Sequence, residues 1–377
     1  MRIARVDLHE LALPLVEPFA ISGGVMHERR SWIVVLDDGE GHQGYGECPP
    51  FALPFYSEET LATTKAVLTE VLLPRVVGHT FERPEDVDAA LRAGVRGNHF
   101  ARAAIETAAW DLEADRRGTG LAALLGERLG VTPTQSITCG VALGIPIDRK
   151  PATLARQAAE AVHFGYRRVK IKIAPGWDEE PVRATRRALA GTLLPLTVDA
   201  NGAYHWPDDR ERLAALDDFE LLYIEQPLAP EELVGHAALA QRLRTPVCVD
   251  ETLRSAGTGR QLLDLDGPRV WNVKVHRVGG LTEALRIHRL AQSAGVKLWT
   301  GTMPESGIGS QAALAFAALP GCVYPSDVEA SSRWYRPGTD PIEMVMTDDG
   351  RMGVPDHSVA RLIDDDRYRS AARPITF

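Results

Sequence analysis

Hydrophobic segments in the middle of the chain end, one after another, in a charged side chain. Lys172 closes the first of them, and Asp199, Glu225, Asp250 and Lys274 close or directly follow the next four, at intervals of 26, 25 and 24 residues (199 to 225, 225 to 250 and 250 to 274). A strand, a helix and two short loops need about that length. In a closed parallel barrel the C-terminal ends of the strands meet at one mouth. The spacing therefore predicts a barrel with charged side chains gathered at its mouth.

The alternation of strand and helix patterns extends through most of the second half of the chain. Strand-like runs begin near eight residues: Ile137, Arg168, Leu196, Leu221, Val247, Val270, Lys297 and Cys322. Helical periodicity lies between them over residues 152–163, 181–190, 231–243, 281–294 and 310–318. Eight such units predict a (β/α)8 TIM-like barrel of the α/β class.

The residues before the barrel predict an α+β capping domain. Residues 3–15 and 31–37 alternate like strands, and Asp37-Asp38-Gly39 favours a hairpin into residues 44–48. Ser57 has the character of a helix N-cap, and residues 99–117 have helical spacing. We expect three parts: a capping domain (1–130), the barrel (136–328), and a C-terminal segment (329–377) that packs back and completes the capping domain.

Composition and net charge limit the kinds of partner that we expect the chain to bind. The chain has 377 residues, 45% of them hydrophobic, and a net charge of −9, which gives no electrostatic footprint for nucleic acid. Its four cysteines form no Cys-x-x-Cys pair, so a zinc ribbon is not expected. The N-terminus has no apolar signal-peptide core, and no run is long enough to cross a membrane. We expect a cytoplasmic enzyme with a small-molecule substrate.

Three carboxylates, those of Asp199, Glu225 and Asp250, would point into one mouth. They would repel one another and be costly to desolvate unless a cation lay among them. All-oxygen ligation suits Mg²⁺, with Mn²⁺ as the alternative. The competing interpretation is that each carboxylate caps a helix or pairs with a lysine.

The lysines predict a reaction class. Lys170 and Lys172 lie two residues apart on one strand and so share a face, where each would lower the pKa of the other towards that of a general base. Lys274 lies four strands away, on the opposite wall. A carboxylate substrate held between them would lose its α-proton to one lysine, giving an enediolate.

These residues carry a resemblance to the muconate-lactonizing-enzyme subgroup of the enolase superfamily. Within it the chain most resembles the o-succinylbenzoate synthase/N-succinylamino acid racemase family. The matching segments are Gly44-Tyr45-Gly46-Glu47-Cys48, Tyr56-Ser57-Glu58, Asn98-His99-Phe100-Ala101, Ala103-Ala104-Ile105-Glu106, Asn272-Val273-Lys274, Arg277-Val278-Gly279-Gly280 and Glu305-Ser306-Gly307-Ile308-Gly309.

The resemblance implies a role for each site residue. Lys172 and Lys274 would be the acid/base pair, and Asp199, Glu225 and Asp250 the Mg²⁺ ligands. Lys170 would tune Lys172, while Asn201 and Glu251 would orient the ligands. Loops 19–26 and 49–56 would close over the mouth, and residues of three loops would contact the substrate: Phe19, Ile21, Phe51, Leu53, Tyr56, Met303, Glu305, Gly307 and Ile308. Plain loop packing is the alternative for the first five of these residues, and for Gly307 and Ile308 the alternative is that they only turn the chain.

Several outcomes stay open. The same intermediate leads to dehydration, which gives o-succinylbenzoate for menaquinone biosynthesis, or to racemisation of an N-succinyl- or other N-acylamino acid. Ala142 stands where relatives can have a serine that helps to hold the succinyl group. Asp327-x-Glu329 is close to the Asp-x-Asp of dipeptide epimerases, so epimerisation is the alternative, together with cycloisomerisation. A non-catalytic binding barrel is a remote alternative, and the sequence leaves open whether the chain forms a homo-oligomer.

Overall fold

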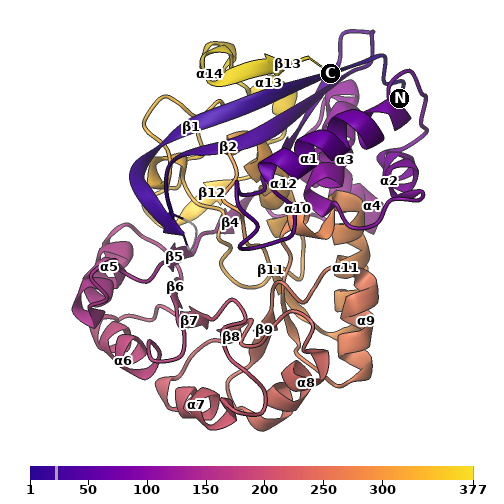
Figure 1. Cartoon of the computed structure of the whole chain (residues 1–377). Coiled ribbons are helices and arrows are strands. Elements are labelled where there is room, and N and C mark those ends of the chain that lie inside the picture. The colour runs from indigo at the N-terminus through magenta and orange to yellow at the C-terminus, as the bar shows by residue number, and fades with distance from the viewer. Residues whose placement is uncertain (22–23, 377) are drawn as a thin grey trace.

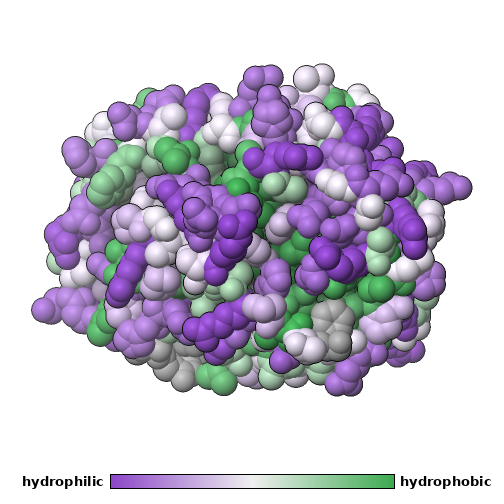
Figure 2. Space-filling view, turned by 90° about the horizontal axis from the view of Figure 1, so that it is seen from above, coloured by the Kyte–Doolittle hydropathy of each residue, from purple (hydrophilic) through white to green (hydrophobic). Residues whose placement is uncertain are grey.

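The computed structural model describes residues 1–21 and 24–376, without the side chains of residues 19–21, 24 and 25. An antiparallel sheet with its helices lies above a curled parallel sheet ringed by helices, and both chain ends lie in the upper part (Figure 1). Viewed from above, hydrophilic residues cover most of the surface, with hydrophobic ones in small groups between them (Figure 2). No helix of the described residues is long and apolar enough to cross a membrane.

The upper part is built on a four-stranded sheet in the order β13-β1-β2-β3. The predicted hairpin is present, because Asp38 Oδ1 accepts the backbone N–H groups of Glu40 and His42 in the turn. The last strand pairs with the first, with Leu8 opposite Ile375, so the C-terminal segment completes this sheet as expected. The strands are β1 (Arg5–Ile21), β2 (Gly24–Asp37), β3 (Gln43–Cys48) and β13 (Ala372–Ile375).

The longest helix of the upper part packs between this sheet and the barrel. The longest spans residues 99–117 as predicted, and a Cβ added at Gly46 would lie 2.0 Å from its Ala104 carbonyl oxygen, so only glycine allows this approach. The prediction of Ser57 as an N-cap is wrong, because Thr60 caps the helix and forms a capping box with Thr63. The helices are α1 (Leu61–Val67), α2 (Pro84–Arg92), α3 (His99–Arg117) and α4 (Leu121–Leu129), with a π-helical turn at Leu68–Leu72 and a 3-10 turn at Leu73–Arg75.

The lower part is a curled sheet of seven parallel strands in sequence order. The eighth segment is not a regular strand: Cys322 bridges to Leu298 on the last strand, and Ser326 bridges to Cys139 just before the first. Ile137 does not begin the barrel as predicted, but lies in β4 (Ser136–Thr138), which pairs with β12 (Arg351–Gly353). The barrel strands are β5 (Val141–Leu143), β6 (Val169–Lys172), β7 (Leu196–Asp199), β8 (Ile224–Glu225), β9 (Val247–Val249), β10 (Val270–Asn272) and β11 (Lys297–Trp299).

Helices surround the curled sheet (Figure 1). Each of the five predicted barrel helices is present, and the helix over residues 281–294 has the predicted bounds. The helices are α5 (Pro151–His163), α6 (Glu179–Ala188), α7 (Arg210–Ala215), α8 (Leu233–Arg242), α9 (Ala256–Asp264), α10 (Val275–Val278), α11 (Leu281–Ala294) and α12 (Gly307–Ala317). The C-terminal segment adds α13 (Val359–Leu362) and α14 (Asp365–Ala371), and 3-10 turns lie at Leu216–Phe219 and Ser331–Arg333.

Buried carboxylates join the two parts. Glu106 of α3 accepts the backbone N–H groups of Leu281 and Thr282 at the start of α11, each at 2.7 Å. Glu47 of β3 accepts the N–H groups of Ser306 and Gly309 at the start of α12. Because the first turn of a helix has unpaired N–H groups and a partial positive charge, each carboxylate supplies what a barrel helix lacks. These bonds fix the capping domain over the barrel.

Candidate active site

Three acids stand in a row at the C-terminal ends of neighbouring strands. Asp199 ends β7 and lies directly opposite Glu225, which ends β8. Asp250 follows β9, whose Cys248 is the register partner of Glu225. All three side chains are buried, and the register of parallel strands brings them to one edge of the sheet.

Left-handed backbone turns follow two of these acids. Asn201 has φ 42° and Gln226 has φ 40°, a conformation that non-glycine residues adopt rarely. Gln226 is fully buried, and its Oε1 accepts the N–H groups of Asp250 and Thr252 at 2.9 and 3.1 Å. Gln226 therefore links the end of β8 to the end of β9, a role that no sequence pattern indicated.

Lys170 and Lys172 approach the first two acids from β6. Lys170 Nζ lies 3.0 Å from Glu225 Oε2 and 2.6 Å from Asp327 Oδ2. Lys172 Nζ lies 2.5 Å from Asp199 Oδ2 and also donates to Asn201 Oδ1. Lys170 is buried, whereas the Lys172 side chain is 33% exposed, so Lys172 has access to the mouth.

Lys274 approaches the third acid from the far side of the row, two residues after the end of β10. Its Nζ lies 3.0 Å from Asp250 Oδ2 and 2.9 Å from the hydroxyl oxygen of Tyr56. Arg277 Nε lies 3.1 Å from Asp250 Oδ1. The two lysines predicted as the acid/base pair thus flank the row of carboxylates, one at each end.

The charges of this cluster shift one another's pKa values. Burial raises the pKa of Glu225 to about 8, and the neighbouring Asp199 adds to that shift. Burial opposes ionisation of Asp199 too, but Lys172 and Lys170 outweigh it and hold its pKa at about 2. Burial alone would lower the pKa of Lys274, yet Asp250 raises it well above its usual range.

Lys170 responds in the same way, since burial lowers its pKa and the carboxylates of Asp327, Glu225 and Asp199 raise it further than burial lowers it. The prediction that a second nearby lysine lowers the pKa is therefore wrong for Lys170. The carboxylates dominate the local field, and Lys170 is an ammonium ion that neutralises buried acids.

The donor chemistry of the row fits a divalent cation. Carboxylate oxygens are the preferred ligands of Mg²⁺, and Asp250 Oδ1 is buried and accepts no hydrogen bond, although the Arg277 guanidinium pairs with it at 3.1 Å. The side chains as placed, however, form no group of three or more acidic, histidine or cysteine residues that could hold a metal within the part of the chain that is described. Lysine ammonium groups lie against the acids instead. This agrees with the competing interpretation of the sequence, in which each carboxylate pairs with a lysine.

Asn201 and Glu251 lie beside this row. Asn201 Nδ2 donates to Glu251 Oε1 at 2.8 Å, and Asn201 Oδ1 accepts from Lys172. Burial raises the pKa of Glu251 to about 7, with Asp250 as a second cause. Asn201 therefore bridges the lysine at one end of the row to the residue after Asp250.

The nine residues predicted to contact the substrate lie in different surroundings in the structure. Tyr56 reaches Lys274, Phe51 is buried beside it with 6.4 Å between the ring centres, and Leu53 is 45% exposed. Phe19 and Ile21 lie in β1, and their side chains are outside what the structure describes.

The remaining four predicted contacts lie on the loop after β11 and at the start of α12. Met303 packs into the core of the capping domain, and Glu305 Oε1 lies 2.9 Å from His276 Nδ1. Gly307 and Ile308 donate their N–H groups to Asp340 and to Ser306 Oγ. These two amides are thus engaged within the protein.

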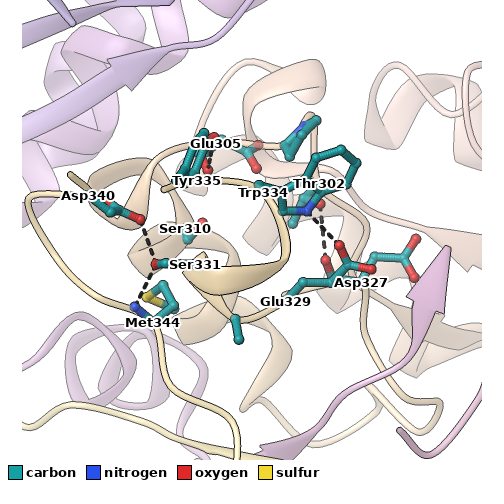
Figure 3. Close-up of a pocket in the computed structure, with 12 residues that line it drawn as sticks. Thr302, Glu305, Ser310, Asp327, Glu329, Ser331, Trp334, Tyr335, Asp340 and Met344 are labelled. Atoms are coloured by element: carbon teal, nitrogen blue, oxygen red, sulfur yellow. Dashed lines mark hydrogen bonds between the residues drawn. The ribbon is translucent and has the colours of Figure 1, made fainter. Parts of the chain in front are cut away.

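A small cavity lies beside the eighth segment (Figure 3). Glu329 points towards Trp334, whose Nε1 donates to Glu329 Oε2 at 2.6 Å, while Ala142 N donates to Glu329 Oε1. Burial raises the pKa of Glu329 to about 7. Asp327, on the same segment, pairs with Arg168 and Lys170 inside the barrel.

Comparisons with known proteins identify the family of the chain. Residues 4–126 match the mandelate racemase/muconate lactonizing enzyme N-terminal domain, and residues 153–358 match the enolase C-terminal domain-like family. The chain belongs to the enolase superfamily, in its mandelate racemase/muconate lactonizing enzyme subgroup.

Two relatives and one solved structure show which members of the superfamily the chain is similar to. The N-succinylamino acid racemase of Thermus thermophilus is 42% identical over 94% of this chain and 93% of its own length. The o-succinylbenzoate synthase of Geobacillus kaustophilus is 40% identical over 89% of this chain and 86% of its own. A crystal structure of a dipeptide epimerase from Cytophaga hutchinsonii, complexed with Mg and D-Ala-L-Val, superposes with a TM-score of 0.87 at 26% identity and covers 100% of this chain and 99% of that one. The chain is thus an enolase-superfamily enzyme related to synthases and racemases.

Proposed function

We propose that the chain is a Mg²⁺-dependent enzyme that removes the proton α to a carboxylate, with Mn²⁺ as an alternative metal. The observation that carries the proposal is the placement of Lys172 and Lys274 at the two ends of one row of acids. A base at each end can serve opposite faces of a substrate held between them.

Asp199, Glu225 and Asp250 would hold the metal. When bound, the cation would supply positive charge that stabilises the negative charge gained by the substrate carboxylate. Lys172, as the free amine, takes the α-proton, and Lys274, as the ammonium ion, faces the enediolate from the other side. Asn201 keeps Lys172 in place through its side-chain oxygen.

Two reactions then follow from one intermediate. In racemisation of an N-succinyl- or other N-acylamino acid, Lys274 gives a proton to the face opposite to the one that lost it. In o-succinylbenzoate synthesis, a menaquinone-biosynthesis step, the β-hydroxyl group leaves, Lys172 returns its proton to that group as water forms, and Lys274 stabilises charge. The two similar proteins described above, a racemase and a synthase, support both reactions.

The test uses the Mg²⁺-loaded enzyme in D₂O with N-succinyl-, N-acetyl- and dipeptide substrates. Exchange of the α-proton is followed by NMR, and the cyclohexadiene precursor is assayed for o-succinylbenzoate in parallel. We expect exchange with N-succinylamino acids. No exchange and no dehydration with any of them, from an enzyme that binds Mg²⁺, would contradict the proposal.

A dipeptide epimerase is the second candidate, and Glu329 favours it. Its carboxylate lies beside a cavity at the end of the eighth segment, where an ammonium group of a dipeptide would find a counter-charge (Figure 3). Against it, Asp327 is already paired with Arg168 and Lys170. Both oxygens of Glu329 also accept hydrogen bonds within the protein, from Trp334 Nε1 and Ala142 N. Exchange with dipeptides alone would favour this candidate.

A further inference from the structure

Tyr56 of the capping domain is in direct contact with Lys274 of the barrel. Its hydroxyl oxygen accepts a hydrogen bond from Lys274 Nζ at 2.9 Å and donates one to Asp250 Oδ2 at 3.3 Å. Lys274 Nζ also lies 4.6 Å from the centre of the Tyr56 ring, within the range of a cation–π contact. One side chain therefore contacts this ammonium group both through its hydroxyl group and through its ring.

The two lysines differ in where their partners come from. Lys172 is bound by Asp199 and Asn201, which both belong to the barrel. Lys274 is bound by one barrel residue, Asp250, and by Tyr56 of the capping domain. A change in the capping loop therefore acts on Lys274 directly, and on Lys172 only through other residues.

A lysine needs such a partner to act at a defined point. Its four-carbon stem is flexible, whereas proton transfer requires the nitrogen within hydrogen-bond reach of the reacting atom. Bonds to Tyr56 and Asp250 use two of the three N–H bonds of Lys274 and so fix the direction of the third. Losing one of them would let the nitrogen move away from the substrate.

The loop that carries Tyr56 is itself held firmly. The guanidinium group of Arg29 on β2 is buried and donates to the carbonyl oxygens of Pro49, Pro50 and Pro304. It also lies 4.8 Å from the ring centre of Phe51, which packs against Tyr56. Arg29 thus ties the loop to β2 and to the barrel loop after β11, and so fixes where Tyr56 stands.

We propose that Tyr56 is a positioning residue for Lys274, through which the capping domain controls proton transfer on one face of the substrate only. This inference rests on the proposed function, in which Lys172 and Lys274 serve opposite faces. It extends the earlier prediction for Tyr56, which gave this residue a substrate contact and no role in the acid/base chemistry.

The experiment compares the Mg²⁺-loaded wild-type enzyme with Tyr56→Phe, which keeps the ring and removes the hydroxyl group. Each enantiomer of an N-succinylamino acid is incubated separately in D₂O, and kcat and KM for α-proton exchange are measured. The Lys172→Ala and Lys274→Ala variants show which enantiomer each lysine deprotonates. A hydrogen bond to a charged group contributes about 1.5–3 kcal/mol, so we expect exchange of the enantiomer facing Lys274 to slow roughly ten- to a hundredfold in kcat.

Exchange of the enantiomer facing Lys172 should stay within about twofold of wild type, because no partner of Lys172 has changed. Tyr45→Phe is the matched control, since it removes a tyrosine hydroxyl that bonds to Gln43 on β3 and should alter neither enantiomer. An equal loss for both enantiomers in Tyr56→Phe, or no loss for either, would overturn the inference and leave the proposed function standing. A wild-type enzyme that exchanges neither enantiomer would overturn the inference. It would overturn the proposed function as well if it also failed to exchange the other test substrates and to dehydrate the cyclohexadiene precursor.

Discussion

Gln226 accepts the backbone N–H of Asp250 at 2.9 Å, so the residue after one candidate metal ligand holds the next one in place. The same amide oxygen accepts the N–H of Thr252, and the amide nitrogen donates to Leu228 O and Thr252 Oγ1. The fully buried side chain thereby supplies the end of β9 with hydrogen bonds that no neighbouring strand provides there.

Gln226→Ala should lower the free energy of unfolding by about 2–4 kcal/mol, because each buried N–H left without a partner costs about 1–3 kcal/mol. Urea unfolding followed by circular dichroism measures this loss. Gln241→Ala is the control, as Gln241 is exposed and its bonds to Leu265 and Asp266 are long, at 3.4 and 3.5 Å. A loss below about 1 kcal/mol for Gln226→Ala would contradict the role given to it.

Lys274→Arg should abolish racemisation and leave part of any dehydration, whereas Lys172→Ala should abolish both. Arginine keeps the positive charge at the end of the row but cannot accept a proton. Lys172 is needed as the base in both reactions. Polarimetry follows racemisation, and the absorbance of the aromatic product follows dehydration. If Lys274→Arg reduced the two reactions by the same factor, the separate roles of the lysines would be wrong.

Removing divalent metal should silence the enzyme and lower its melting temperature, and Mg²⁺ should restore both. A ligand that binds only the folded state stabilises it by about 2.7 kcal/mol at a hundred times its Kd. Differential scanning calorimetry with and without Mg²⁺ gives this shift independently of activity. Asp199→Asn, which removes one carboxylate charge from the row, should show a smaller response, and full activity after thorough chelation would exclude the metal.

The raised pKa of Glu106 predicts that the stability of the protein depends on pH. Burial raises its pKa from 4.5 to about 7 in the folded protein, so the folded state binds the proton more tightly than the unfolded state does. The contribution of Glu106 to stability is therefore fully present below about pH 4.5 and is lost as the pH rises through 7. The shift corresponds to about 3 kcal/mol.

A Glu106→Gln variant cannot ionise and should lack this dependence. The difference in unfolding free energy between wild type and the variant should be larger at pH 5 than at pH 8, measured by urea unfolding at both. The opposite order would mean that the N–H groups of Leu281 and Thr282 stabilise the carboxylate more than burial destabilises it.

Gly307→Ala should destabilise the protein strongly, because the new Cβ would lie 1.8 Å from Ile342 O at the first turn of α12. Backbone must then move, and overpacking of this kind costs about 1–3 kcal/mol or more. Gly353→Ala is the control, since a Cβ there meets nothing within 4 Å. Melting temperatures of the two variants test this, and equal values would refute the close approach.

Local patterns predicted most of the fold. Helices over residues 99–117 and 281–294 have the expected bounds because a glycine in the left-handed conformation, Gly118 or Gly295, stops each of them. Ser57 is not the N-cap, because Thr60, three residues on, caps the helix and forms a capping box with Thr63. The prediction of a regular eighth strand is wrong, because the described residues of this segment make only single bridges to the neighbouring strands.

The charged row could be predicted from spacing, since strand ends in a parallel barrel converge whatever the loops do. The partners of the row could not. Tyr56 and Lys274 are 218 residues apart, and Arg168 meets Asp327 across 159. Such contacts depend on how the capping domain and the eighth segment pack, which no local periodicity encodes.

The pairing of β13 with β1 has a consequence for the order of events during synthesis. The edge of the capping sheet beside β1 is completed only by residues 372–375, which follow every barrel strand in the chain, although the other three strands of that sheet precede the barrel. A ribosome-bound chain has all its barrel strands before that edge is closed. The cover of the barrel is therefore complete only after β13 has been made and has paired with β1.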